Sequence, residues 1–106
     1  MDYNLIITEA AEHQLEQIIF YLLYELENSS AATHLLNQIE RLYIHLKENP
    51  FQFPLLEHPY FPTKKYCKAV ILTTNYLIIY RIENKCVYII GFFHQSENYF
   101  LKLSDA

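Results

Sequence analysis

Residues 75–94, NYLIIYRIENKCVYIIGFFH, decide the fold of this chain. Two apolar, aromatic-rich runs flank a polar break at residues 83–85, a pattern that predicts two strands joined by a tight turn. Because side chains alternate along a strand, Leu77, Ile79 and Arg81 are expected on one face and the intervening residues on the other. Both faces are largely apolar, so we expect this hairpin in the middle of a sheet.

The composition indicates a single domain over residues 1–106. Apolar residues make up 52% of the chain, which is enough for one hydrophobic core at this length. The only glycine, Gly91, excludes a glycine-rich phosphate loop, and two cysteines are too few for a disulfide scaffold. The sequence has neither an apolar run of transmembrane length nor a signal peptide at its start. We therefore expect a soluble cytoplasmic protein.

Charge is unevenly distributed along the chain. The formal net charge is −4, with a net −6 in residues 1–48 and a net +2 in residues 49–106. An anionic partner is therefore expected to contact the second half. The positive excess there is too small to indicate nucleic-acid binding on charge alone.

The first half of the chain predicts a short strand followed by two helices. The Thr8 hydroxyl is placed to cap an amphipathic helix over residues 9–27. A polar break follows, where Ser29 or Ser30 is expected to cap a second helix. That helix ends before Pro50, because proline disfavours helix in the residue that precedes it. Two helices with so short a link predict an antiparallel helical hairpin.

The predicted fold class is α+β, with the element order β-α-α-β-β-β. Strands are expected over residues 3–8 and 64–72 as well as in the central hairpin, and the proline-rich residues 50–62 are expected to form an ordered loop. The helical hairpin would pack on one face of an antiparallel sheet, which leaves the face with Leu77 and Ile79 uncovered and available to a partner. The aromatic residues expected to be exposed at a partner surface are Tyr60, Phe61, Phe92 and Phe93.

Six short stretches follow one another along the chain: TEAA at 8–11, residues 21–28 at the end of the first helix, Ala31-Ala32, LKENP at 46–50, NYLIIYRI at 75–82 and HQSENY at 94–99. In this order and spacing they resemble the RelE/ParE superfamily of toxins from bacterial type II toxin–antitoxin (plasmid-stabilisation) systems. The long helical hairpin and the NYLIIY strand are more similar to the ParE side. The resemblance spans nearly the whole chain, and it implies a toxin domain that a cognate antitoxin neutralises.

The same resemblance separates this chain from the ribonuclease members. Those members usually carry an arginine directly after the aromatic residue of the central strand, where this chain has Leu77. Many also carry an arginine at the position of Cys67, and Arg-Asp-Tyr where residues 97–99 read ENY. RNA cleavage needs a base, an acid and cationic groups at the phosphate. The resemblance therefore implies a ParE-like toxin that binds DNA gyrase and is not itself a hydrolase.

Two alternatives remain open. One is a ribosome-dependent mRNA endonuclease of the RelE type, whose catalytic residues would be His94, Tyr99, Lys68 and Arg81. Arg81 could instead bind an antitoxin carboxylate on the open sheet face. Structural roles compete with these: His94 is more simply a strand-end histidine with one hydrogen bond, and Arg81 either pairs with Glu83 or another local acid or extends its charge to water. The other alternative is a degenerate toxin that only binds its antitoxin.

The histidines and cysteines predict no metal or cofactor site. His34 and His45 share a helix face, but eleven residues of helix place them too far apart to bind one ion. Cys67 and Cys86 are expected on strands that another strand separates, so they are not expected to form a disulfide.

Overall fold

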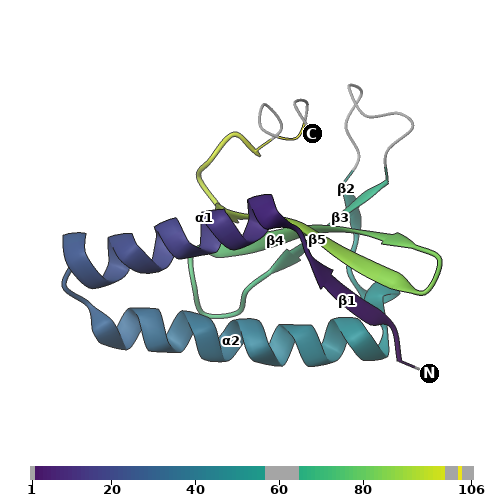
Figure 1. The fold of residues 1–106 in the computed structure, drawn as a ribbon, viewed down its shortest axis with the longest axis horizontal. Helices are drawn as coiled ribbons and strands as arrows, with labels where there is room; N and C mark the ends of the chain where they lie inside the picture. The colour runs from purple at the N-terminus through teal and green to yellow at the C-terminus, as the bar shows by residue number, and fades with distance from the viewer. Residues whose placement is uncertain (1, 57–64, 100–102, 104–106) are drawn as a thin grey trace.

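The structure is a computed structural model that describes residues 2–56, 65–99 and 103. Its elements are, in chain order, β1 (Asn4–Ile7), α1 (Glu9–Phe20), the π-helix η1 (Tyr21–Glu25), α2 (Ser29–Glu48), the 3-10 helix η2 (Pro50–Gln52), β2 (Leu55–Leu56), β3 (Tyr66–Val70), β4 (Tyr76–Glu83) and β5 (Cys86–His94). The two long helices lie antiparallel against one face of the sheet (Figure 1). This arrangement confirms the predicted α+β class and the helical hairpin.

The described strands form one sheet with the order β1-β5-β4-β3-β2. The predicted hairpin of β4 and β5 lies at its centre, as its two apolar faces require. Neighbouring strands are antiparallel except β1 and β5, which pair in parallel with Leu5 opposite Val87. The chain between these two strands includes both long helices and three further strands, which is long enough for the parallel pairing that the sequence pattern did not predict. Nor did it predict the short edge strand β2, which lies in the proline-rich segment and pairs Leu55 with Cys67.

The predicted cap at Thr8 is confirmed, and it does more than start α1. Thr8 Oγ1 accepts a hydrogen bond from the Ala11 amide at 3.2 Å, which satisfies one of the free amides of the first helical turn. The same hydroxyl donates to the Ile89 carbonyl at 2.7 Å. One side chain therefore fixes the start of α1 against the middle of β5.

The cap of α2 differs from the expectation. Asn28 Oδ1 accepts a hydrogen bond from the Ala31 amide at 3.0 Å, so Asn28 is the capping residue. The prediction of a cap at Ser29 or Ser30 is wrong, because Asn28 has the non-helical backbone of a cap and both serines lie in the first helical turn.

The first helix changes its repeat before it ends. Tyr21–Glu25 form a π-helical turn, in which the Leu26 amide donates to the Tyr21 carbonyl at 3.0 Å. Glu27 then adopts a left-handed φ of 49°, which ends the helix. A π-turn widens the helical repeat and re-aims the side chains around it, and such turns are frequent at functional sites.

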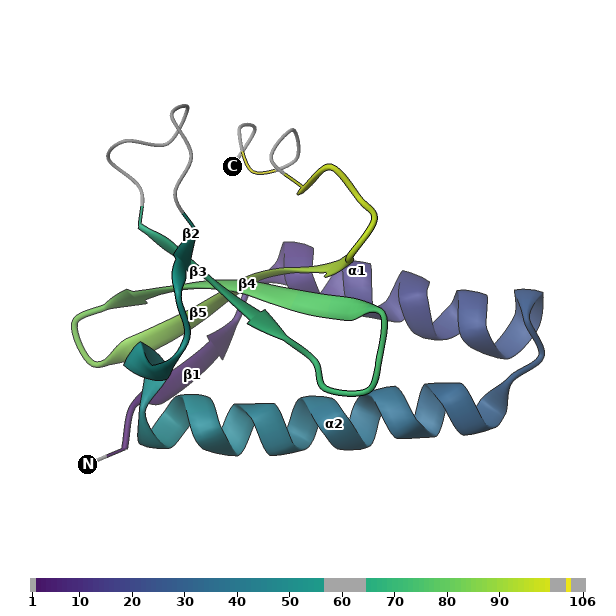
Figure 2. The ribbon, with the colours of Figure 1, turned by 180° about the vertical axis from the view of Figure 1, so that it is seen from behind.

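The helices and the central strands bury one continuous core between them. The apolar face predicted for α2 packs against the inner faces of β4 and β5, where Ile78, Val87 and Ile89 have no exposed surface. The Tyr80 hydroxyl, at the base of this core, donates to the Pro50 carbonyl at 2.5 Å and so anchors the end of the helical hairpin to β4. The opposite end of the hairpin projects beyond the strands (Figure 2).

The middle of the second face of the sheet is covered, contrary to expectation. Leu77 and Ile79 are 1% and 0% exposed, and they form a second apolar cluster with Tyr99 and Leu103 from the segment after β5. The prediction that Leu77 and Ile79 form an open partner surface is therefore wrong. The physical reason is that Tyr99 and Leu103, from the segment after β5, cover this part of the face in place of a helix.

Phe92 and Phe93 are both 2% exposed, so the prediction that they form an exposed aromatic surface is also wrong. Phe92 belongs to the core on the helix side, and Phe93 belongs to the second cluster. Because β5 lies between β1 and β4 and packs against other residues on both faces, both of these rings are buried. Tyr60 and Phe61, the other two residues of that prediction, lie outside the described residues.

Candidate functional site

The structure does not bring together the four residues predicted for a nuclease site. Lys68 lies opposite Ile79 and Tyr99 packs against Phe93 at 5.8 Å between ring centroids, so both are on the sheet face that points away from the helices. Arg81 is on that face as well, two residues along β4 from Ile79. His94 lies opposite Tyr76 on the helix side of the sheet. The sheet itself thus separates His94 from the other three.

Arg81 is engaged locally. Its guanidinium forms an ion pair with Glu83 and lies 4.6 Å from the centre of the Tyr88 ring, which is opposite Arg81 on β5. The two charged side chains are 42% and 54% exposed, so the pair contributes little to stability. The structure therefore agrees with the structural role considered for Arg81, in which its charge pairs with Glu83.

Seven of the twelve large apolar side chains that are exposed among the described residues lie on the helical hairpin, and sequence reasoning missed them. Residues 18–26 read IIFYLLYEL, an almost unbroken apolar run on a helix that buries only one face. This run is the sequence feature that indicates exposed apolar side chains, since a surface helix normally carries a polar outer face. Phe20 is 58% exposed and Tyr24 is 67% exposed. The other exposed side chains of this set are Tyr21, Leu23, Leu26, Leu36 and Ile44.

A groove of about 760 Å³ runs between the two helices on the side of the hairpin that carries Phe20 and Tyr24. We call it the outer groove. Three acidic residues, Glu12, Glu16 and Glu40, are among its lining. The lining side chains are Ile7, Glu12, Leu15, Glu16, Ile19, Phe20, Leu23, Tyr24, Leu36, Ile39, Glu40 and Tyr43. It is an apolar groove with a negatively charged border.

Tyr43 is the polar group inside the outer groove. Its hydroxyl oxygen is buried and has no hydrogen-bond partner among the residues that the structure describes. Burial raises the pKa of Tyr43 to about 12, and the carboxylate of Glu12 adds to the shift. The hydroxyl therefore stays protonated at physiological pH and is available as a donor or an acceptor.

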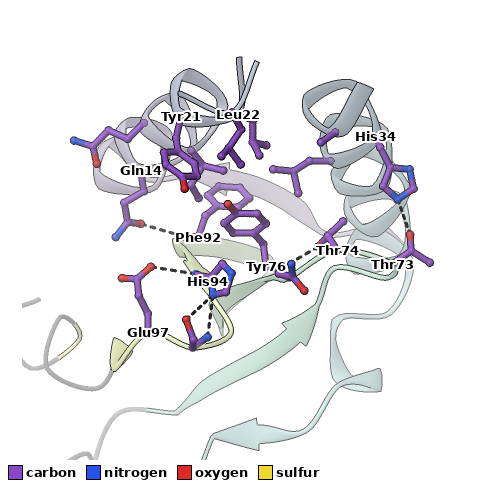
Figure 3. Close-up of a pocket in the computed structure, with 17 residues that line it drawn as sticks. Gln14, Tyr21, Leu22, His34, Thr73, Thr74, Tyr76, Phe92, His94 and Glu97 are labelled. Atoms are coloured by element: carbon purple, nitrogen blue, oxygen red, sulfur yellow. Dashed lines mark hydrogen bonds between the residues drawn. The ribbon is translucent and has the colours of Figure 1, made fainter. Parts of the chain in front are cut away.

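A second pocket, of about 630 Å³, lies where the projecting hairpin overhangs the end of the sheet (Figure 3). We call it the sheet-end pocket. The π-turn η1 supplies Tyr21 and Leu22, α2 supplies His34, and the sheet supplies Tyr76 and His94. Its other lining residues are Gln14, Gln17, Ile18, Leu26, Ala31, Leu35, Thr73, Thr74, Asn75, Phe92, Ser96 and Glu97.

Hydrogen bonds fix the orientation of His94 in the sheet-end pocket. The Ser96 amide donates to His94 Nδ1 at 3.1 Å, and Ser96 Oγ lies 2.7 Å from the same nitrogen. Because a backbone amide only donates, Nδ1 is an acceptor and the proton of the neutral ring lies on Nε2. The ring meets Tyr76 edge to face with centroids 5.2 Å apart. Finally, the His94 amide donates to Glu97 Oε1 at 3.1 Å.

His34 holds the other wall of the sheet-end pocket. The Thr73 hydroxyl donates to the Leu72 carbonyl at 2.6 Å, so its oxygen accepts from His34 Nε2, also at 2.6 Å. Thr73 has a φ of 60°, a strained conformation for a β-branched residue. The histidine thereby fixes a strained β3–β4 turn to α2.

No group of three or more histidine, cysteine or acidic side chains with the geometry of a metal site occurs within residues 2–56, 65–99 and 103. Cys67 and Cys86 are free cysteines. Over the same part of the chain, no helix combines the length and apolar character needed to cross a membrane.

Comparisons with known proteins agree with this fold. A solved structure described as the chromosomal ParDE TA system from P. aeruginosa superposes with a TM-score of 0.68 at 16% sequence identity, covering 87% of this chain and 95% of that chain. No curated protein matches this chain significantly. The family model of the ParE toxin of the type II toxin–antitoxin system, parDE, matches residues 5–99. The chain therefore belongs to the ParE toxin family of type II toxin–antitoxin systems.

Proposed function

We propose that this protein acts in the cytoplasm as a growth-inhibiting toxin, that a cognate antitoxin neutralises it, and that it acts by binding DNA gyrase. Its membership of the ParE family supports the toxin assignment. The observation that favours a binding mechanism over RNA cleavage is the separation of His94 from Lys68 and Tyr99 by the sheet. A general acid and a general base must reach the same scissile bond, which groups on opposite faces of a sheet do not do.

The antitoxin is proposed to bind the outer groove. Large exposed apolar patches mark interaction sites, and the groove places Phe20, Leu23 and Tyr24 beside a row of acids. A segment with an apolar face and basic flanks would bury these side chains and satisfy the charges. Antitoxin segments that fold on binding present such a face. The site proposed from sequence, the face with Leu77 and Ile79, is replaced by this one because those residues are buried.

The gyrase proposal is tested by a DNA supercoiling assay with purified protein. We expect loss of supercoiling or accumulation of a gyrase–DNA cleavage complex. The variant Lys68→Ala should inhibit as well as the parent, since Lys68 is not proposed to perform chemistry and lines neither the outer groove nor the sheet-end pocket. Normal supercoiling, together with mRNA cleavage in the ribosomal A site that His94→Ala abolishes, would instead establish the nuclease alternative.

The antitoxin proposal is tested by co-purification with the protein encoded beside this one and by the affinity of the complex. The substitution Tyr24→Asp should raise the dissociation constant at least about tenfold, because a buried aromatic anchor contributes about 2 kcal/mol or more. Ile44→Asp is the control, since Ile44 is a large apolar residue of the same hairpin that is 58% exposed but does not line the groove. Equal effects of the two substitutions would contradict the groove assignment. Harmless expression without the antitoxin would identify a degenerate toxin.

A further inference from the structure

We infer that the sheet-end pocket binds the guanidinium group of an arginine side chain presented by a polypeptide partner. The pocket is separate from the outer groove, because the two sites share no lining residue: Tyr21 lines the pocket and Tyr24 lines the groove. The inference rests on the chemistry of the pocket lining, and it does not depend on whether the partner is gyrase or an antitoxin.

The walls of the pocket are aromatic rings that come from different elements. Tyr21 lies on η1, Tyr76 on β4 and His94 on β5, and the buried Phe92 ring supports them from below. Figure 3 shows these side chains converging between the hairpin and the end of the sheet. The face of an aromatic ring attracts a cation within about 6 Å of its centre. A set of rings around one space is therefore the surface that a cationic group prefers.

The charge of the lining selects for a cation. Among the described residues that line the pocket, Glu97 carries a carboxylate and none is lysine or arginine. Burial raises the pKa of Tyr76, and the neighbouring Tyr21 and Glu97 raise it further, so the Tyr76 hydroxyl is neutral and lies in the field of the carboxylate. A phosphate or carboxylate ligand would find no positive partner in this lining, whereas a guanidinium would find hydroxyl, amide and carboxylate acceptors.

The walls are held in place before any ligand arrives. Gln14 Oε1 accepts a hydrogen bond from the Phe92 amide at 3.0 Å, and Ser96 fixes the His94 ring. A preorganised site loses little conformational entropy on binding. The lining also includes the apolar side chains Ile18, Leu22 and Leu35, which suit the methylene stem of an arginine. A planar guanidinium stacks on aromatic faces in a way that the ammonium of lysine does not.

Nuclear magnetic resonance titration with short peptides tests the assignment. The probe is acetyl-Leu-Arg-Leu-amide, and its control has citrulline, the neutral isostere, in place of arginine. We expect saturable chemical-shift changes of the Thr74–Tyr76 and His94–Glu97 amides with the arginine peptide. The dissociation constant of the citrulline peptide should be at least about fivefold larger. Equal affinity for the two peptides would overturn the assignment, because the charge would then contribute nothing.

Variants of the protein locate the binding. Tyr21→Leu and Glu97→Gln should each weaken the arginine peptide at least about threefold, whereas Tyr24→Leu, on the same π-turn but in the outer groove, should leave its affinity unchanged. Tyr21 is 47% exposed and Tyr24 is 67% exposed, so both leucine variants should fold, and their amide spectra verify this. An equal loss for the two leucine variants would contradict the assignment. Free arginine amide binding as tightly as the peptide would contradict a polypeptide ligand.

Discussion

The outer groove and the sheet-end pocket use neighbouring side chains of one helical turn in different ways. The groove is a surface formed by the two helices of the hairpin, and its aromatic residue Tyr24 is mostly exposed. The pocket is formed by four parts of the chain, and its aromatic residues are held by hydrogen bonds and by the core beneath them. This difference shows two kinds of binding site. An apolar surface exposed by helices binds a partner by burying apolar area, whereas a pocket built from several elements can recognise one chemical group.

The largest expected difference between the two sites is in stability. Phe92→Ala removes a buried ring beneath the sheet-end pocket and should lower the free energy of unfolding by about 3–5 kcal/mol. Phe20→Ala, in the outer groove, removes the same ring from a mostly exposed position and should change it by about 0.5 kcal/mol or less. Urea unfolding of both variants measures the contrast. Similar losses would mean that the groove is as much a part of the core as the pocket floor.

Gly91 tests how tightly the pocket floor is built. An added methyl group would lie 2.6 Å from Phe93 Cε2 and 2.7 Å from Gln14 Oε1. Gly91→Ala should therefore destabilise the protein by about 1–3 kcal/mol, because the ring and the glutamine must both move. Combined with Gln14→Ala, the loss should be smaller than the sum of the single losses, since the two changes share one contact. Strict additivity in urea unfolding would show that Gln14 does not constrain this position.

The smallest of these effects is the titration of Tyr43 in the outer groove. Its pKa is raised from 10.0 to about 12 in the folded protein, so the stabilisation is complete below pH 10 and is lost as the pH rises towards 12. Because Tyr43 is only partly buried, the loss should be at most about 2 kcal/mol. Tyr43→Phe should remove this loss.

The control for the Tyr43 titration lies inside the same molecule. Tyr76 and Tyr80 also have raised pKa values, so the variant should keep their share of the alkaline destabilisation. Unfolding by urea at pH 8 and pH 11 therefore compares the parent with Tyr43→Phe. At pH 8 the variant should be as stable as the parent or up to about 1 kcal/mol more stable, because an unpartnered hydroxyl is removed. An identical pH dependence of the two proteins would place the titration elsewhere.

Much of the fold was predictable because local rules determine it. Alternation in residues 75–94 predicted the central strands, and apolar periodicity with the Thr8 cap predicted the helical hairpin. The motifs that resemble the RelE/ParE superfamily predicted the family that the comparison shows. The cap of α2 was misassigned by one or two residues, since Asn28, Ser29 and Ser30 are all good capping residues and sequence alone does not rank them.

The candidate sites were less predictable, because they depend on which surfaces remain uncovered. The sequence showed that both faces of the central hairpin are apolar, but not that Tyr99 and Leu103 would cover the second face. It showed His94 and Arg81 on neighbouring strands, but not that the sheet would separate them. The exposed residues of the hairpin were hidden in a run that equally suits a buried helix.

The sequence by itself therefore determined the two long helices, every strand of the described sheet except β2, their order and the family, because periodicity, caps and turn residues act over a few positions. Only the tertiary structure decided how residues 75–94 are used. Tyr80 and Phe92 are core on the helix side and Phe93 is core on the other side, whereas Tyr76 and His94 contribute the edge of a pocket that η1 and α2 complete. The physical reason is that burial and charge complementarity are properties of surfaces, which exist only once distant segments have packed together.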